Sequence, residues 1–497
     1  MAVVPKDNRI QNTEETAHAI ASVNDNGNAK DDSQPKSETF RSFVEETSMH
    51  GARFLFSKNV FRRGFWTVLL ILSSGYCFFQ IYAGVIFYYQ RPFNTKITKI
   101  TRKCDTSLPF PAVTLCNLNL FNLRRYRSYQ IERNLSMETI DEKRDVIAKL
   151  LARSKDVFHN ETKTKHQELF WRFYGEVPNI FFLNLFSHEI EEMLLPGPTF
   201  NSCLIDETAC GPENFIQFIS STYGRCYTFN SGQNGNPVIN ATMAGQLNGL
   251  RLLLNIERES YLENPLNPFV GLTVLIHDQR TFPFMEQFGF FVQPGVRTLC
   301  SIKRKKIVNL EYPYVTSCIK NRKLEKLHNT DNSYSKPGCL MQCLGQFVIA
   351  RCGCRPVEYR GKYGKSTFRD KCEESCREPC QHTEYETFLS YAGLQREVFA
   401  EKLSSNVNLT KDFLLYENFL NLSDREKKEY IDENIISLDI FFNDMSYDEI
   451  TQTKAYEAWT LLANLGGTFG LFLGISILTV LEFLEFIIRR IWSNICK

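Results

Sequence analysis

Enzyme motifs are missing from this chain of 497 residues, which has no G-x-S-x-G, no H-E-x-x-H and no phosphate-binding P-loop. It also lacks a charge excess: 58 Lys and Arg stand against 56 Asp and Glu, and nothing in that balance suggests nucleic acid as a partner. Residues 1–40 are polar and lack the apolar core of a signal peptide. We therefore expect a protein that is not an enzyme, with no cofactor or metal site, and a disordered segment over 1–40.

Cysteine is present in quantity and is unevenly placed. Fourteen of the 16 cysteines lie between Cys104 and Cys380, while Cys77 falls in an apolar run and Cys496 is next to last. A dense, even set in one interval indicates disulfide bonds formed in an oxidising compartment. The alternative is a set of zinc sites, but no His pair lies at finger spacing among these cysteines. Cys352-Gly-Cys354 has the wrong spacing for a redox C-x-x-C pair.

Glycosylation sequons indicate the same compartment. All of them fall in the stretch that the cysteines mark as external: Asn134, Asn160, Asn240, Asn408 and Asn421.

A first apolar run covers Phe65 to Tyr89 and contains no charged residue. It is long enough to cross the roughly 30 Å hydrocarbon core of a bilayer. Lys58, Arg62 and Arg63 precede it, which places its N-terminal end in the cytoplasm. The alternative, a buried core helix, would not explain a run of this length without an ionisable group.

A second apolar run covers Ala458 to Ile488 and is followed by Arg489 and Arg490. Basic residues after the run place that end in the cytoplasm as well. The sequence therefore predicts a multi-pass protein of the cell membrane with both termini cytoplasmic. The predicted parts are a disordered N-terminus over 1–40, a pre-membrane segment over 41–64, spans over 65–89 and 456–488, an external domain over 90–455 and a C-terminal tail over 489–497.

The second run is unusual for a simple anchor because it carries small and acidic residues: Gly466, Gly467, Gly470, Gly474, Ile475, Ser476, Glu482 and Glu485. Small residues allow close helix packing, and they also allow a helix to unwind where it lines water; both interpretations stay open for the first three glycines. Glu482 and Glu485 lie three residues apart, so they share a helical face. Carboxylates at membrane depth normally face a water-filled path, and a ring of them would attract cations. One such span cannot enclose a pore, so an oligomer is required.

The external stretch predicts an α+β domain with a central sheet. Buried strands are expected over Phe110–Cys116, Leu250–Ile256, Val270–His277 and Ser437–Phe442. Helices are expected over Met137–Ser154 and Leu409–Asn434, the latter with Asn408 as a cap. Cysteine density peaks over 318–380, which we expect to be held by its bridges rather than by a large core.

Several segments, taken in order, closely resemble the degenerin and epithelial sodium channel family, in particular its acid-sensing and peptide-gated branch. They are His50-Gly51, FPAVTLCNLN at 110–119, YGRCYTFN at 223–230, GLRLLLNIERESYL at 249–262, QFGFFVQPG at 287–295, LDIFF at 438–442, KAYE at 454–457 and LGGTFGLFLGISILTVLEFLEF at 465–486. The resemblance covers the chain from about residue 40 to its end.

The resemblance implies a trimer that conducts mainly sodium, is blocked by amiloride, and opens when a hand-like outer domain moves. It implies that Gly474, Ile475 and Ser476 form the selectivity constriction, with the glycines and carboxylates of the second span lining the pore. It makes His50, Gly51 and Thr460 gating candidates. Bulky Ile475 stands where acid-sensing relatives have a small residue, so calcium permeability stays open.

The resemblance also implies disulfide pairs. They are Cys116–Cys226, Cys203–Cys210, Cys318–Cys380, Cys339–Cys376 and Cys343–Cys372. Cys104, Cys300, Cys352 and Cys354 do not fit the family pattern, and a Cys104–Cys300 bridge is a guess.

Departures from the acid-sensing pattern bear on what opens the channel. Arg91-Pro92 stands where those channels carry histidines, and Lys99 and Asn443 match a facing pair of carboxylates that could share a proton. The thumb loop between Cys354 and Cys372 is short and basic. Glu257, Glu259 and Glu263 could line an acidic pocket, although a solvated face is the preferred interpretation.

We therefore predict that an extracellular peptide, rather than a proton, is the agonist. A proton-gated sodium channel remains the alternative. Rivals of other classes are a purinergic-type channel and a non-conducting receptor or adhesion protein, and a subunit that conducts only in mixed trimers is also compatible with the sequence. Tyr314 is expected near the junction of the outer domain with the spans, or else in an ordinary aromatic core contact.

Overall fold

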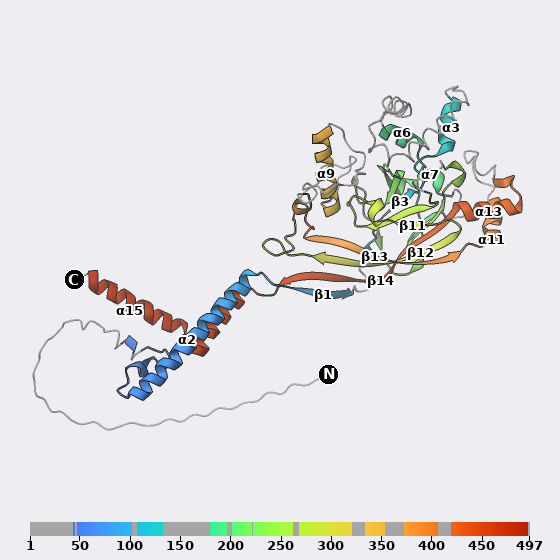
Figure 1. Cartoon of the computed structure of the whole chain (residues 1–497). Coiled ribbons are helices and arrows are strands. Elements are labelled where there is room, and N and C mark those ends of the chain that lie inside the picture. Colours follow the sequence, from blue (N-terminus) through green and yellow to red (C-terminus); the bar gives the residue numbers. More distant parts are fainter. Residues whose placement is uncertain are drawn as a thin grey trace, which may run out of the picture. The chain divides into compact units, whose positions relative to one another are not determined.

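The computed structural model describes residues 43–44, 47–101, 107–132, 179–195, 201–220, 222–261, 268–320, 333–352, 372–405 and 419–495. The chain divides into two compact units (Figure 1). One comprises Met1–Ile86 together with Trp459–Lys497, and the other comprises Phe87–Ala458. We refer to them as the helical unit and the sheet unit.

The helical unit contains α2, Val60–Tyr89, a helix of 30 residues that is long and apolar enough to cross a membrane. Asn59 starts it, because its side-chain oxygen accepts hydrogen bonds from the amides of Phe61 at 3.1 Å and Arg62 at 3.4 Å. The first apolar run of the sequence lies wholly within this helix.

The second apolar run forms two helices, α14 over Ala458–Leu473 and α15 over Ile477–Ile495. They bend by 78° at the intervening break, and together they have the length and composition of one broken span or a re-entrant loop. The break lies at Gly474, Ile475 and Ser476, the residues that the resemblance implies for the selectivity constriction. The helix continues past Ile488, where the sequence placed the end of the span.

The sheet unit is built on two large sheets and one small one. The seven-stranded sheet runs in the order β13 (Gln381–Gly393), β12 (Val296–Val308), β14 (Ile435–Lys454), β9 (Leu250–Asn255), β4 (Cys203–Ile205) and β5 (Thr208–Ala209), with β1 (Phe93–Thr101) also paired to β14. The five-stranded sheet has the order β11 (Phe290–Val292), β10 (Leu272–His277), β3 (Ala112–Asn117), β7 (Gly224–Phe229) and β6 (Phe215–Ser220). Short strands β2 (Leu108–Pro109) and β8 (Asn240–Ala241) form the third sheet.

All four predicted strands are present in the structure, as β3, β9, β10 and part of β14. Their side chains are buried almost without interruption, which is why they appear as apolar runs rather than alternating patterns. One hydrophobic core joins both large sheets and includes Phe110, Leu252, Val274, Ile302 and Ile440. The sheet-containing domain expected from the sequence is therefore confirmed.

The sheet unit also contains helices among its described residues. They are α3 (Leu123–Glu132), α6 (Asn179–Phe186), α7 (Ile190–Met193), α8 (Met285–Phe288), α9 (Lys336–Cys352), α11 (Arg396–Ser404) and α13 (Asp424–Asn434). The helix predicted over Met137–Ser154 lies outside the described residues, as do Asn408 and the start of the helix predicted over Leu409–Asn434. Within the latter, α13 begins after Ser423, whose hydroxyl and amide pair with the amide and carboxylate of Glu426 in a capping box.

Among the described residues, five disulfides join parts of the sheet unit that are 7 to 110 residues apart in sequence. They pair the same ten cysteines that the resemblance implies: Cys116–Cys226, Cys203–Cys210, Cys318–Cys380, Cys339–Cys376 and Cys343–Cys372. The described part of 318–380 has only a small buried cluster around Cys339 and Cys376, so its bridges supply much of its order. Cys300 is buried and has no disulfide to a described residue, while Cys104 lies outside that part of the chain.

Candidate ion-pathway and ligand sites

The helix break is set by Gly474, which has φ 67°, a left-handed conformation that glycine adopts without strain. Next to it, the amide of Ile475 donates to the carbonyl oxygen of Phe469 at 3.3 Å. Ser476 then begins α15: its hydroxyl accepts from the Thr479 amide at 3.3 Å, and its own amide donates to the Thr479 hydroxyl at 3.0 Å. The break is therefore a defined turn with its own caps.

His50 packs directly against this turn. Its amide donates to the carbonyl oxygen of Leu473 at 3.1 Å. A Cβ added at Gly474 would lie 1.5 Å from Nδ1 of His50, so no larger residue fits there without displacing the imidazole. Gly51 has φ 82°, and a Cβ there would lie 2.8 Å from the Trp66 ring. His50 therefore lies against the break between α14 and α15, and Gly51 lies close to the Trp66 ring on α2.

Thr47 and Ser48 were not singled out from the sequence, yet they tie the same segment to α15. The Ser48 and Thr479 hydroxyls lie 2.6 Å apart, and the Thr47 hydroxyl donates to Oε2 of Glu482 at 3.2 Å. The Ser48 amide also donates to Glu482 at 3.3 Å. No sequence signal marked these hydroxyls, because their partners are more than 430 residues away.

The remaining residues predicted for the pore are spread along the second broken helix. Glu485 forms an ion pair with Arg489 at 2.5 Å, one turn further along α15. The three glycines and Thr460 lie on α14, and no described atom comes within 4 Å of a Cβ built at Gly466 or Gly467. Within one chain Gly466 and Gly467 therefore present an open surface.

In the sheet unit, an ion-pair ladder runs where β1, β14 and β12 meet. Lys99 pairs with Asp444 at 3.1 Å, Lys303 with Asp448 at 2.5 Å, and Lys306 with Glu449 at 2.8 Å. The expected facing of Lys99 and Asn443 is wrong, because the antiparallel register places Lys99 opposite Asp448. The Ser446 hydroxyl, followed by Lys99, lowers the pKa of Asp444 to about 2.

A second charged cluster, the Glu257 junction, lies between β9 and α3. Glu257 is 1% exposed, which corrects the preferred interpretation of a solvated face. Its carboxylate accepts hydrogen bonds from Arg124 at 2.6 Å and from the Asn122 side chain at 2.9 Å. Burial raises the pKa of Glu257 to about 7 in spite of Arg124. Glu257 also has φ 54°, uncommon for a residue with a side chain.

Exposed Glu259 follows Glu257 on the chain, whereas Glu263 lies outside the described residues. Tyr314 is 5% exposed and interacts electrostatically with Arg91, which precedes β1. Of the sequons, Asn240 and Asn421 are exposed, and Asn134, Asn160 and Asn408 lie outside the described part of the chain.

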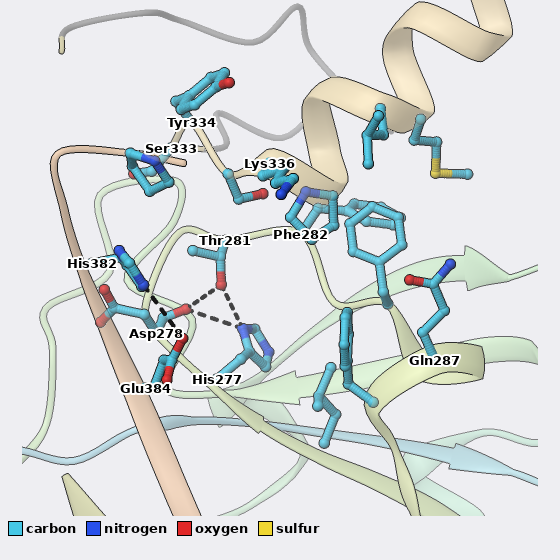
Figure 2. Close-up of a pocket in the computed structure, with 18 of the residues that line it drawn as sticks. His277, Asp278, Thr281, Phe282, Gln287, Ser333, Tyr334, Lys336, His382 and Glu384 are labelled. Carbon is cyan, nitrogen blue, oxygen red and sulfur yellow. Dashed lines mark hydrogen bonds and ion pairs between the residues drawn. The ribbon is translucent and has the colours of Figure 1, made fainter. Parts of the chain in front are cut away.

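The sheet unit also contains a cleft of about 1350 Å³ between the end of β10, α8, the start of α9 and the start of β13. Figure 2 shows Tyr334 and Lys336 near the start of α9, with His382 and Glu384 on β13 and Asp278 between them. We call this the β10–β13 cleft. The sequence analysis did not find this cleft, because its walls come from separate segments, and two of them, the end of β10 and the start of β13, are roughly 100 residues apart.

Within the cleft, hydrogen bonds fix the turn after β10. Nδ1 of His277 lies 2.9 Å from the Thr281 hydroxyl, which donates to the carbonyl oxygen of Asp278 at 2.6 Å (Figure 2). On the β13 wall, Nε2 of His382 pairs with Glu384 at 3.3 Å. This leaves concave, partly charged walls, as ligand sites typically have.

Taken together, the described parts combine a disulfide-bridged sheet domain with helices suited to a bilayer, one of them broken at a glycine turn. The length and composition of these helices are those of membrane spans. Residues 43–486 match the family model described as "Amiloride-sensitive sodium channel", and the chain belongs to that family.

Its relatives are ion channels. The chain is 30% identical to Acid-sensing ion channel 1C of Danio rerio over 490 residues, covering 92% of this chain and 86% of that protein. It is 29% identical to Acid-sensing ion channel 2 of Homo sapiens, with 90% and 86% covered. It is 27% identical to the Bile acid-sensitive ion channel of Homo sapiens, with the same shares covered. Members of this family are channels and not enzymes, so the prediction that this chain is not an enzyme is confirmed, and the purinergic-type rival is wrong.

Proposed function

We propose that this chain is one subunit of a trimeric, amiloride-sensitive sodium channel of the cell membrane. In this proposal α2 and the α14–α15 pair are its two spans, both termini are cytoplasmic, and the sheet unit is extracellular. The basic residues flanking the helices, the disulfides and the two exposed sequons support this topology. A tag on either terminus that antibody reaches on intact cells would contradict it.

The observation that carries the pore assignment is the turn at Gly474 with His50 packed against it. A helix that unwinds at membrane depth needs partners for its freed backbone groups or a water-filled path. The His50 amide meets one freed carbonyl, and the Ser73 hydroxyl donates to another, that of Phe472, at 2.6 Å. The break is thus stabilised on one side, and its other groups can serve as the constriction of a pore shared by three copies.

The test is sodium current in oocytes expressing the full chain. Gly474→Ala is expected to abolish the current while surface labelling persists, because a Cβ there collides with His50. Gly64→Ala is the matched control, since a Cβ at Gly64 meets nothing within 4 Å. Replacing Ser476 with a larger residue should change ion selectivity, including any calcium permeability that Ile475 confers. Unchanged reversal potentials would place the filter elsewhere.

For the agonist, we propose an extracellular peptide. Each carboxylate of the ion-pair ladder has a lysine partner, and the pKa of Asp444 is lowered to about 2, so Asp444 does not take up a proton near neutral pH. Applying amidated peptides and acid steps to the same cells separates the cases. Large acid-evoked currents with no peptide response would reverse the assignment.

A proton-gated channel is the second candidate, and the Glu257 junction favours it. Its buried carboxyl has a pKa of about 7 and therefore changes charge within the physiological range. If protons open the channel, Glu257→Gln should remove the acid response. If the peptide opens it, the same substitution should only change the pH dependence of the peptide current.

A further inference from the structure

Glu482 on α15 is held by residues that precede α2 in the sequence. Oxygen Oε2 of its carboxylate accepts hydrogen bonds from the Thr47 hydroxyl at 3.2 Å, the Ser48 amide at 3.3 Å and the Ser48 hydroxyl at 3.4 Å. Hydrogen bonds to a carboxylate are charge-assisted and therefore stronger than neutral ones. This oxygen is thus turned toward residues 43–44 and 47–51 of its own chain, which we call the pre-helix segment.

A chain of hydrogen bonds runs from the helix break to Glu482. The Ser476 amide donates to the Thr479 hydroxyl at 3.0 Å, and the Thr479 and Ser48 hydroxyls lie 2.6 Å apart. Ser48 has a single hydroxyl proton, so when it donates to Glu482 it accepts the proton of Thr479. Thr479 is fully buried, which keeps solvent from taking its place in the chain. The proposed constriction is therefore connected to Glu482 through a residue of the pre-helix segment.

Further contacts hold the pre-helix segment against the second broken helix. The Phe43 ring stacks on Phe486 with ring centroids 4.5 Å apart, and it meets the edge of Phe483 at 4.9 Å. At the other end of the segment, the His50 amide donates to the last carbonyl oxygen of α14. The segment is therefore fixed near both of its ends as well as at the Glu482 carboxylate.

Glu485 lies in a different setting. Its side chain is 61% exposed and pairs with Arg489, one turn further along the same helix. An exposed pair of this kind contributes little to stability and leaves its charges open to solvent. Of the two acids on α15, Glu485 is therefore the more accessible to a passing cation, whereas Glu482 is bound by its own chain.

Resting on the proposed function, we propose that Glu482 is a positioning residue, which anchors the pre-helix segment and through it the helix break, rather than a charge that passing ions meet. This differs from the pore-lining role that the resemblance implies for Glu482. Without the anchor, Ser48 loses its acceptor, and the segment no longer fixes the Thr479 hydroxyl beside the Ser476 amide. The anchor therefore sets how often the channel opens, and not which ions pass or how fast, because it biases the arrangement of the break.

Glu482→Gln and Glu482→Leu separate the two roles, because the amide keeps an acceptor oxygen without the charge and leucine keeps neither. Single-channel recording of the full chain in oocytes, opened by acid or by an amidated peptide, measures conductance and open probability separately. Glu482→Gln should keep the wild-type conductance and sodium-to-potassium permeability ratio. Glu482→Leu and Ser48→Ala should each change the open probability about tenfold, through loss of a hydrogen bond to a charged group. Ser48→Thr retains the hydroxyl and should restore the wild-type value.

The contact between the segment and α15 is tested without current. The Ser48 and Thr479 hydroxyls lie 2.6 Å apart, so sulfur atoms in their places would be close enough to bond. In the detergent-purified full chain carrying Ser48→Cys and Thr479→Cys, oxidation with copper phenanthroline should form a disulfide between the two positions, detected by mass spectrometry. Ser48→Cys alone is the control. Absence of this disulfide would overturn the anchor.

Two further variants are controls for the recordings. Thr67→Ala removes a hydroxyl that donates to the carbonyl oxygen of Arg63 within α2 at 2.8 Å, and it should not change the open probability. Glu485→Gln removes the accessible charge and should lower the conductance, which shows that the recording detects a charge in the ion path.

The outcomes distinguish the anchor from the channel proposal. Lowered conductance or altered ion preference in Glu482→Gln would overturn the anchor, because it would place that charge in the ion path. An unchanged open probability in Ser48→Ala would overturn it as well, and both results would leave the channel proposal standing. The disulfide in a chain that conducts no current would support the anchor while contradicting the channel proposal.

Discussion

The ion-pair ladder and the Glu257 junction both pair carboxylates with cations, yet the pKa values of Asp444 in the ladder and Glu257 in the junction shift in opposite directions. In the ladder, Lys99 and Asp444 are 59% and 46% exposed, and the pKa of Asp444 falls to about 2. At the junction, Glu257 has an arginine at 2.6 Å, yet burial raises its pKa to about 7. The comparison shows that desolvation, rather than the presence of a cation, decides which carboxyl responds near neutral pH.

Removing Arg124, the cation of the Glu257 junction, should have the largest effect on local stability. Arg124→Ala leaves the Glu257 carboxylate buried without its ion pair, which costs about 3–5 kcal/mol when the group is ionised. The loss should be smaller at pH 6 than at pH 8.5, since a protonated carboxyl needs no cation. Hydrogen exchange of the β9 and α3 amides measures this opening free energy. The control is Arg258→Ala, which breaks the half-exposed pair with Glu433 and should cost little at either pH.

Glu257→Gln should have the next largest effect, and this effect is on how the stability of the sheet unit depends on pH. The pKa of Glu257 is raised from 4.5 to about 7, so its contribution to stability is full below about pH 4.5 and is lost as pH rises through 7. The loss amounts to about 3 kcal/mol. The amide does not titrate, so the Gln variant should show a flatter profile of exchange protection between pH 5 and 8. An unchanged slope would mean that Glu257 is not the group that titrates.

Asp444→Asn should have the smallest effect on stability, because its ion pair with Lys99 is half exposed and screened by solvent. We expect a loss of at most about 1 kcal/mol at pH 7. The lowered pKa of Asp444 means that its contribution is present above about pH 3.8 and is lost as pH falls toward 2. Between pH 6 and 8 the substitution should not alter the pH dependence of current. A changed profile there would show that the ladder also senses protons.

The parts of the fold and of the candidate sites that could be predicted are those set by residues close together in the sequence. The buried strands and the apolar helices were predictable because each is a continuous run, whereas the break at Gly474-Ile475-Ser476 was expected from the family resemblance. The prediction that Lys99 faces Asn443 was wrong because the strand register, which the sequence does not reveal, decides which residue lies opposite Lys99. Glu257 was misjudged because its neighbours Arg258 and Glu259 are exposed, and only the fold turns its side chain inward toward Arg124.

The parallel pairing of β12 with β14 limits how an opening signal can travel through the sheet unit. These strands are paired from Arg297 opposite Ser437 to Val308 opposite Thr451, with one irregularity after Ile302. Sliding one strand by a single residue would turn every side chain to the opposite face and expose the shared core. We therefore expect the two strands to move together, because sliding one along the other would disrupt the core that they share.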